Sequence, residues 1–337
     1  MMDGGLELFP DTAEAGPEGR LRIAGLDVID LAEAYGTPLY IYDEVTLRAR
    51  CQAYREALAI HYPAQSAVAY AAKAYLCTAL VRLLMAEAVG QDAPMELDVV
   101  SGGELYIALQ GGFSPARIHL HGNNKSPAEL AFALDVGVGR IVVDNFTELT
   151  RLADLAAQRH SQVAIWLRLL PNVDADTHAY RKTGLLNSAH KPFGFPIATG
   201  DAARALQLAL DAPYLAPMGL HAHIGSQIFE TRPFVQTVET LLDFAAEAQA
   251  ATSFKLQELS PGGGLGVRYV PTDPEVSVEA YGRAVSEAVV QGCRTRGLAL
   301  PRLILEPGRS IVGPAGVALY TIGGRRVMPG GRTYVGV

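Results

Sequence analysis

The sequence predicts an α/β fold of the (β/α)8 barrel type, because apolar strands and amphipathic helices alternate over most of the chain. Eight short β-type runs lie within residues 66–308, and helical stretches separate them. Strands that are apolar almost throughout indicate a parallel sheet covered by helices. Eight strand–helix units over roughly 250 residues match the size of a closed barrel.

The predicted barrel strands follow one another in chain order. The first four are SAVAYAAK at 66–73, MELDVVS at 95–101, RIHLHG at 117–122 and RIVVDN at 140–145. The last four are VAIWLRLL at 163–170, MGLHAHIG at 218–225, KLQELSPGG at 255–263 and RLILEPG at 302–308. A doubly wound sheet is the alternative, but its first turn should carry G-x-G-x-x-G, and here that turn reads AYAAKAYLC.

Charge and cysteine content exclude several classes of partner. The chain of 337 residues has 28 Lys plus Arg against 35 Asp plus Glu, a net charge of −7, and no basic stretch, so neither nucleic acid nor an anionic membrane is expected. The cysteines Cys51, Cys77 and Cys293 are scattered, without metal-ligand spacing. No apolar run is long enough for a membrane helix and the first residues lack a secretory signal, so we expect a cytoplasmic protein.

Polar residues gather where the predicted strands end, which is where a barrel carries its function. Lys73 ends the first strand, and His223 and Ser226 end the sixth. The glycines at 262–264 follow the seventh strand, and Glu-Pro-Gly-Arg at 306–309 follows the eighth. A purely structural barrel gives no reason for such a concentration.

The glycine triplet predicts a phosphate site. Loops after the last two strands of such barrels commonly bind phosphate through backbone N–H groups, and glycine leaves no Cβ in the way. Gly308 and Ser226 are candidates for further donors. A tight turn is the alternative, and the neighbouring Gly308-Arg309 pair favours the phosphate site.

Lys73 lies in the apolar run VAYAAKAYL, where an ammonium group is poorly solvated. Burial lowers the pKa of a lysine and makes its neutral amine available to an aldehyde. A lysine that extends to solvent at a strand end is the alternative. Together, the amine and the phosphate site favour a phosphorylated aldehyde, and pyridoxal 5'-phosphate (PLP) meets both requirements.

Three further residues have candidate roles around PLP. The carboxylate of Glu306 would keep the pyridine nitrogen protonated, which makes the ring a strong electron sink. His223 would pack its flat ring against the cofactor, and Arg309 would hold a carboxylate or the phosphate. A core histidine and a surface salt bridge are the respective alternatives.

Seven motifs in order resemble the diaminopimelate decarboxylases, a family of barrel-type, alanine-racemase-like PLP enzymes. They are YAAKA, DVVSGGE, HGNNKS, LRLLPNVDADTHAYRKTG, GLHAHIGSQI, SPGGGLGVRY and EPGRSIVGPAG, and the resemblance covers about residues 21–337. It implies decarboxylation of meso-2,6-diaminopimelate to L-lysine and CO2, the last step of lysine biosynthesis, through an aldimine on Lys73. It also implies a homodimer with shared active sites.

The resemblance assigns roles to individual residues. Lys73 and His223 would be catalytic, Arg309 would also contact substrate, and no metal is expected. The residues that would bind the cofactor are Lys73, His223, Ser226, Gly262, Gly263, Gly264, Glu306, Pro307, Gly308 and Arg309.

The resemblance also suggests a division of the chain. Residues 1–20 would be a flexible tail, 21–43 would belong to a β domain, and 44–310 would form the PLP-binding barrel. Residues 311–337 would begin a C-terminal β domain that is largely missing from this chain. That missing part carries the family's proton-donor cysteine, and none of the three cysteines present is given a catalytic role.

Two local departures from the family are noted. Tyr75 stands where many relatives have Asn, and SAHKPFGF at 188–195 stands where relatives often read SKFG. We expect the first to change the packing of the rim modestly.

Three other functions remain as alternatives. An ornithine, lysine or arginine decarboxylase of this fold would share the lysine, His-x-Gly-Ser and Glu-x-Gly-Arg elements, although the HGNNKS and EPGRSIVGPAG contexts favour diaminopimelate. A racemase would place arginine at the position of Glu306. A non-catalytic PLP-binding barrel is the third.

Overall fold

The structure, a computed structural model, describes residues 5–87, 95–175, 184 and 193–337. The chain divides into two compact units, which are considered separately. The larger comprises Cys51–Val267 and Pro274–Ser310, and the smaller comprises Met1–Arg50, Arg268–Asp273 and Ile311–Val337. Among the described helices, none combines the length and the apolar character needed to cross a membrane.

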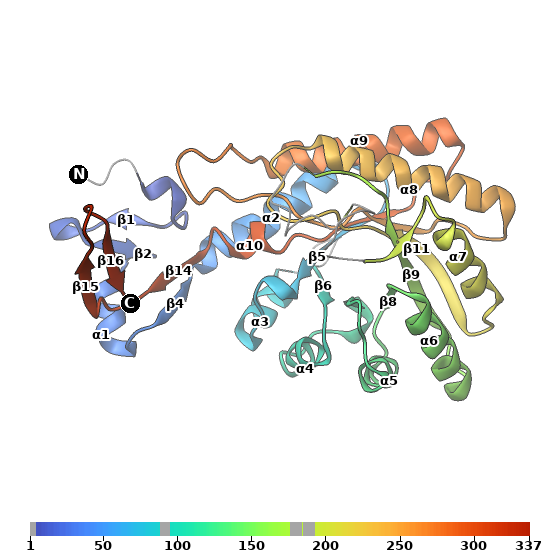
Figure 1. Cartoon of the computed structure of the whole chain (residues 1–337), viewed down its shortest axis with the longest axis horizontal. Coiled ribbons are helices and arrows are strands. Elements are labelled where there is room, and N and C mark those ends of the chain that lie inside the picture. The colour runs from blue at the N-terminus through green and yellow to red at the C-terminus, as the bar shows by residue number, and fades with distance from the viewer. Residues whose placement is uncertain (1–4, 88–94, 176–183, 185–192) are drawn as a thin grey trace. The chain divides into compact units, whose positions relative to one another are not determined.

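The larger unit is a closed parallel barrel of eight strands, which confirms the predicted fold (Figure 1). Its strands in spatial order are β5 (Ser66–Ala71), β6 (Glu96–Val99), β7 (Ile118–Leu120), β8 (Arg140–Val143), β9 (Val163–Leu170), β11 (Leu215–His221), β12 (Glu258–Ser260) and β13 (Arg302–Leu305). Pairing of β13 with β5 closes the barrel. The short β10 (Phe195–Pro196) pairs with β9. Each predicted strand overlaps the observed one.

Helices cover the outside of the barrel strands, as Figure 1 shows for α3 to α9. They are α2 (Glu44–His61), α3 (Thr78–Ala86), α4 (Gly102–Gln110), α5 (Pro127–Val136), α6 (Phe146–Arg159), α7 (Asp201–Asp211), α8 (Arg232–Ala251) and α9 (Val278–Arg296). The short α10 (Arg309–Val312) follows β13. Side-chain caps fix where several begin. Ser126 accepts a hydrogen bond from the Glu129 N–H, and the Glu129 carboxylate accepts one from the Ser126 N–H, a capping box that starts α5.

The barrel interior alternates small and large apolar side chains. Ala67 and Ala69 of β5 pack in one buried cluster with Val142, Trp166 and Ile304, which come from three other strands. The alanines leave room for the indole of Trp166, which is fully buried. Such layers of inward-facing residues make the barrel a solid core rather than a pore.

A buried ionic cluster also joins strands inside the barrel. Glu258 of β12 accepts hydrogen bonds from Arg140 Nε and Nη2 at 2.6 and 2.7 Å, and from Trp166 Nε1 at 2.7 Å. Arg302 Nη1 of β13 lies 3.7 Å from the same carboxylate. Because β8 and β12 are not neighbours in the sheet, Glu258 links strands across the interior.

The smaller unit consists of short antiparallel pairings. β1 (Glu14–Ala15), β2 (Leu21–Ile23) and β3 (Leu26–Asp27) form one sheet, and α1 (Val28–Tyr35) follows it. β4 (Leu39–Tyr42) pairs with β14 (Gly316–Leu319), and β15 (Gly324–Val327) pairs with β16 (Thr333–Gly336). β1 lies within residues 1–20, where a flexible tail was expected. The domain boundaries proposed from the sequence stay a prediction.

Replacing Glu258 with alanine is expected to destabilise the barrel. The change leaves Arg140 and the Trp166 N–H without their buried carboxylate, which costs about 3–5 kcal/mol of unfolding free energy. Urea unfolding followed by fluorescence measures this, because Trp166 is the single tryptophan. Glu287→Ala on the exposed face of α9 is the control, with an expected change below about 0.5 kcal/mol. Equal losses in the two variants would contradict a structural role for the cluster.

Candidate active site

A cavity of about 250 Å³ lies at the carboxyl ends of strands β5, β11, β12 and β13. Most of the predicted cofactor residues line it, namely Lys73, His223, Ser226, Gly264, Glu306, Gly308 and Arg309. These residues are widely separated in sequence, and the barrel brings them to one rim. The position agrees with the general placement of active sites in (β/α)8 barrels.

The other three predicted cofactor residues adjoin this cavity. The Gly262 carbonyl accepts a hydrogen bond from the Glu306 N–H at 3.1 Å, and the Pro307 carbonyl accepts one from the Ala71 N–H at 3.0 Å. A Cβ on Gly263 would lie only 1.9 Å from the Glu306 carbonyl oxygen. The loop after β12 therefore packs directly on the end of β13, and this contact requires glycine.

Backbone conformation explains why the other two positions of the triplet are glycine. Gly262 and Gly264 have φ values of +82° and +116°, in the region that side chains disfavour. A Cβ on Gly264 would also lie 2.2 Å from the Gly225 carbonyl oxygen. The tight turn and the close approach, which the sequence left as alternatives, therefore occur together. The loop presents bare backbone toward the cavity at Gly264.

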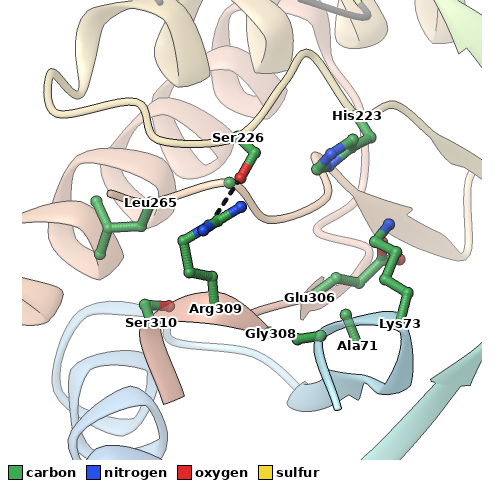
Figure 2. A pocket seen from close by; sticks show the side chains of 11 residues that line it. Ala71, Lys73, His223, Ser226, Leu265, Glu306, Gly308, Arg309 and Ser310 are labelled. Atoms are coloured by element: carbon green, nitrogen blue, oxygen red, sulfur yellow. Dashed lines mark hydrogen bonds between the residues drawn. The ribbon is translucent and has the colours of Figure 1, made fainter. Parts of the chain in front are cut away.

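Lys73 lies in the 3-10 turn Ala72–Ala74 that follows β5. Its neighbours Ala71 and Ala72 are buried, but Lys73 itself is exposed at the cavity. The expectation that apolar flanks would bury the amine is therefore wrong, because the turn directs it out of the strand. In Figure 2 the amine points into the space that His223 and Glu306 also line.

His223 follows β11 and is half-buried at the cavity. Burial lowers the pKa of its imidazole well below the usual range, and the positive charges of Lys73 and Arg168 act in the same direction. The ring is therefore neutral at neutral pH. A flat, uncharged ring at this position suits contact with an aromatic ligand.

Glu306 is a buried carboxylate with directed donors. Its Oε1 accepts a hydrogen bond from Ser260 Oγ at 2.7 Å, and its Oε2 lies 3.0 Å from His221 Nε2. Burial alone would raise the pKa of Glu306, but His221 and His121, together with the hydrogen bonds from His221 and Ser260, hold it well below its usual range. The cavity therefore has an ionised carboxylate on its wall.

Several residues near Glu306 had no role in the sequence analysis. Asp98 on β6 is fully buried, and His121 Nε2 lies 3.6 Å from its Oδ1 and 3.7 Å from Glu306 Oε1. Burial raises the pKa of Asp98 to about 7; Lys73 opposes the shift and Glu306 adds to it. The two acidic residues of MELDVVS, set in a mainly apolar strand, are a sequence signal that could have drawn attention to this position.

Donors for an anion lie on the far side of the cavity from Lys73. Arg309 Nε donates a hydrogen bond to Ser226 Oγ at 3.2 Å (Figure 2). Beneath them, the Tyr54 hydroxyl and Ser310 Oγ are 2.6 Å apart and fix the start of α10. An amine, a buried carboxylate and a cation–hydroxyl pair around one cavity fit the aldehyde, the ring nitrogen and the phosphate of PLP.

Of the two departures from the family pattern, the structure describes Tyr75 and the end of the 188–195 segment. The carbonyl of Tyr75 accepts a hydrogen bond from the Tyr70 hydroxyl at 2.7 Å, which ties the rim to β5. Most of the 188–195 segment lies outside the described residues, as does much of LRLLPNVDADTHAYRKTG.

Comparison with known proteins identifies the family of this chain. Residues 44–313 match the family model described as pyridoxal-dependent decarboxylase, pyridoxal binding domain. The diaminopimelate decarboxylase of Halalkalibacterium halodurans is 43% identical over 98% of this chain and 73% of its own length. That of Bacillus subtilis is 42% identical over 97% of this chain and 72% of its own length.

A solved structure shows the same architecture. The diaminopimelate decarboxylase of M. jannaschii in complex with L-lysine superposes with a TM-score of 0.85 at 31% identity, covering 96% of this chain and 72% of that one. The chain therefore belongs to the pyridoxal-dependent decarboxylase family, among the diaminopimelate decarboxylases.

Proposed function

We propose that this protein is a PLP-dependent carboxy-lyase that converts meso-2,6-diaminopimelate to L-lysine and CO2. The observation that carries the proposal is the single cavity lined by the Lys73 amine, the ionised Glu306 carboxylate and the Ser226–Arg309 pair. Relatives that are over 40% identical to this chain across the aligned residues are diaminopimelate decarboxylases. The relative from M. jannaschii has been solved with L-lysine bound, which is the product that the proposal requires.

Each side chain has a task that follows from its surroundings. When bound, PLP supplies a sink for the electron pair left behind as a carboxylate departs as CO2. Lys73 would hold the aldehyde carbon through its amine, and Glu306 would hold a proton on the ring nitrogen. Neutral His223 would offer a flat ring to the cofactor without adding a charge that would compete with Glu306.

The phosphate is assigned to the opposite side of the cavity. Arg309 and Ser226 provide donors, and the glycine loop offers bare backbone at Gly264, where no Cβ takes up space. Arg309 is also the candidate to contact a substrate carboxylate. Arginine suits both tasks because its planar guanidinium has several donors in a fixed arrangement.

We further propose that the protein is cytoplasmic and works as a homodimer with shared active sites. The scattered cysteines support a reducing compartment, and the family resemblance supports the dimer. Light scattering on the purified protein measures the second point directly.

Lys73→Ala is expected to abolish cofactor attachment. Without the amine, the visible absorbance of bound PLP disappears and decarboxylation falls by at least ~10³-fold. Absorbance spectra after gel filtration and CO2 release measure the two effects. Lys255→Ala, which removes an exposed lysine remote from the cavity lining, is the matched control and keeps both signals. An unchanged spectrum in Lys73→Ala would contradict the proposed attachment.

The proposed substrate is expected to be preferred over ornithine. Ornithine lacks the second carboxylate of diaminopimelate, so a site that binds this carboxylate should favour meso-diaminopimelate by about 10²-fold or more in kcat/KM. Coupled detection of CO2, with lysine quantified by chromatography, measures the ratio. A higher value for ornithine would overturn the substrate assignment and leave the roles of Lys73 and Glu306 intact.

A further inference from the structure

The Glu306 carboxylate is held from two sides by strands that are adjacent in the barrel. His221 ends β11 and Ser260 ends β12, and the two residues are paired in register. Both are buried, with exposed fractions of 1% and 0%. Glu306 follows β13, the next strand, so its two oxygens meet the His221 and Ser260 side chains. Strand register therefore brings His221 and Ser260 together, and Glu306 reaches them from just past the end of β13.

The proton positions on both partners can be assigned from their other contacts. Ser260 Oγ accepts a hydrogen bond from the Gly262 N–H at 3.1 Å, so its own hydrogen is available for Glu306 Oε1 at 2.7 Å. His221 Nε2 lies 3.0 Å from a carboxylate oxygen, so this nitrogen carries the hydrogen. Its Nδ1 has no hydrogen-bond partner among the described residues, as suits the neutral tautomer.

Neutral donors have a specific consequence for Glu306. They orient the carboxylate and favour its ionised form, but they do not neutralise its charge as an arginine would. The charge stays available to a group in the cavity. The other ionisable groups near it are Lys73, Asp98, His121, Arg168, His223 and Tyr281. Of these, His121 Nε2 lies 3.7 Å from Glu306 Oε1, beyond hydrogen-bond distance.

We propose that His221 and Ser260 are positioning residues that hold Glu306 as an oriented anion and thereby set the preference of the site for a protonated ring nitrogen. The inference rests on the proposed function, because it takes PLP as the ligand. Ser260 has a second effect. Its hydroxyl bonds both to Glu306 and to the Gly262 N–H, and so it joins the carboxylate to the glycine loop.

The test compares two cofactors that differ only at the ring nitrogen. One is PLP, and the other is its carbon analogue, in which C–H replaces that nitrogen. Dissociation constants for both are measured by titration of the apo protein, with visible absorbance as the signal. The ratio of the two constants reports the contribution of Glu306 and cancels effects on the phosphate or on Lys73.

His221→Phe and Ser260→Ala are each expected to reduce the preference for PLP over its carbon analogue by about tenfold, since each loses one hydrogen bond to a charged group. His221→Gln restores part of the preference because its side-chain amide nitrogen can take the place of Nε2 as a donor. In a Glu306→Gln background, His221→Phe changes the ratio no further, because its effect passes through Glu306.

His119→Phe is the matched control. His119 is also a buried barrel histidine, with Nε2 3.1 Å from a carboxylate oxygen of Glu96, but it lies in a different ionic cluster. Its loss is expected to lower stability and leave the cofactor ratio unchanged.

The outcomes separate this inference from the proposed function. A wild-type preference for PLP that persists in His221→Phe and Ser260→Ala overturns the positioning role alone. Equal weakening of both cofactors in these variants also overturns it, since that result indicates a structural role. A wild-type protein that binds the two cofactors equally overturns both this inference and the role proposed for Glu306.

Discussion

The buried charge of Glu306 is the constraint around which the barrel rim is arranged. An ionised carboxylate that is 4% exposed is stable only if donors replace the water it has lost. Ser260 and His221 provide two such donors at 2.7 and 3.0 Å. The neighbouring Asp98 has its pKa raised to about 7, mainly by burial and further by the charge of Glu306, so a second full negative charge is disfavoured there.

The barrel contains a second set of buried carboxylates, and these are stabilised in a different way. Burial would raise the pKa of Glu96, but His119 and Arg302 lower it to about 2. Glu258 is likewise paired with Arg140. These carboxylates are neutralised by arginine and serve to join strands. Glu306 is instead hydrogen-bonded to Ser260 and His221, and by our proposal its charge remains available to a ligand. The same residue type therefore joins strands in one layer and, by our proposal, serves the ligand in the other.

The barrel and most of the cavity were predictable from the sequence because their signals are local. Apolar runs marked the strands, and polar residues at the strand ends marked the rim. The roles of Ser260, His221 and Asp98 were not predictable, because they depend on which side chains point inward and on register across three strands. The exposure of Lys73 was also missed. A 3-10 turn after β5 decides it, and apolar flanking residues do not reveal that turn.

Barrel closure is what makes the cavity possible. Lys73 follows the first strand and Glu306 follows the last, more than 200 residues later in the chain. They meet because β13 pairs with β5, a pairing that continues past the strands as the Ala71 N–H donates to the Pro307 carbonyl at 3.0 Å. An open sheet with the same strand order would place these two residues at opposite edges. Closure therefore creates the site as well as burying the core.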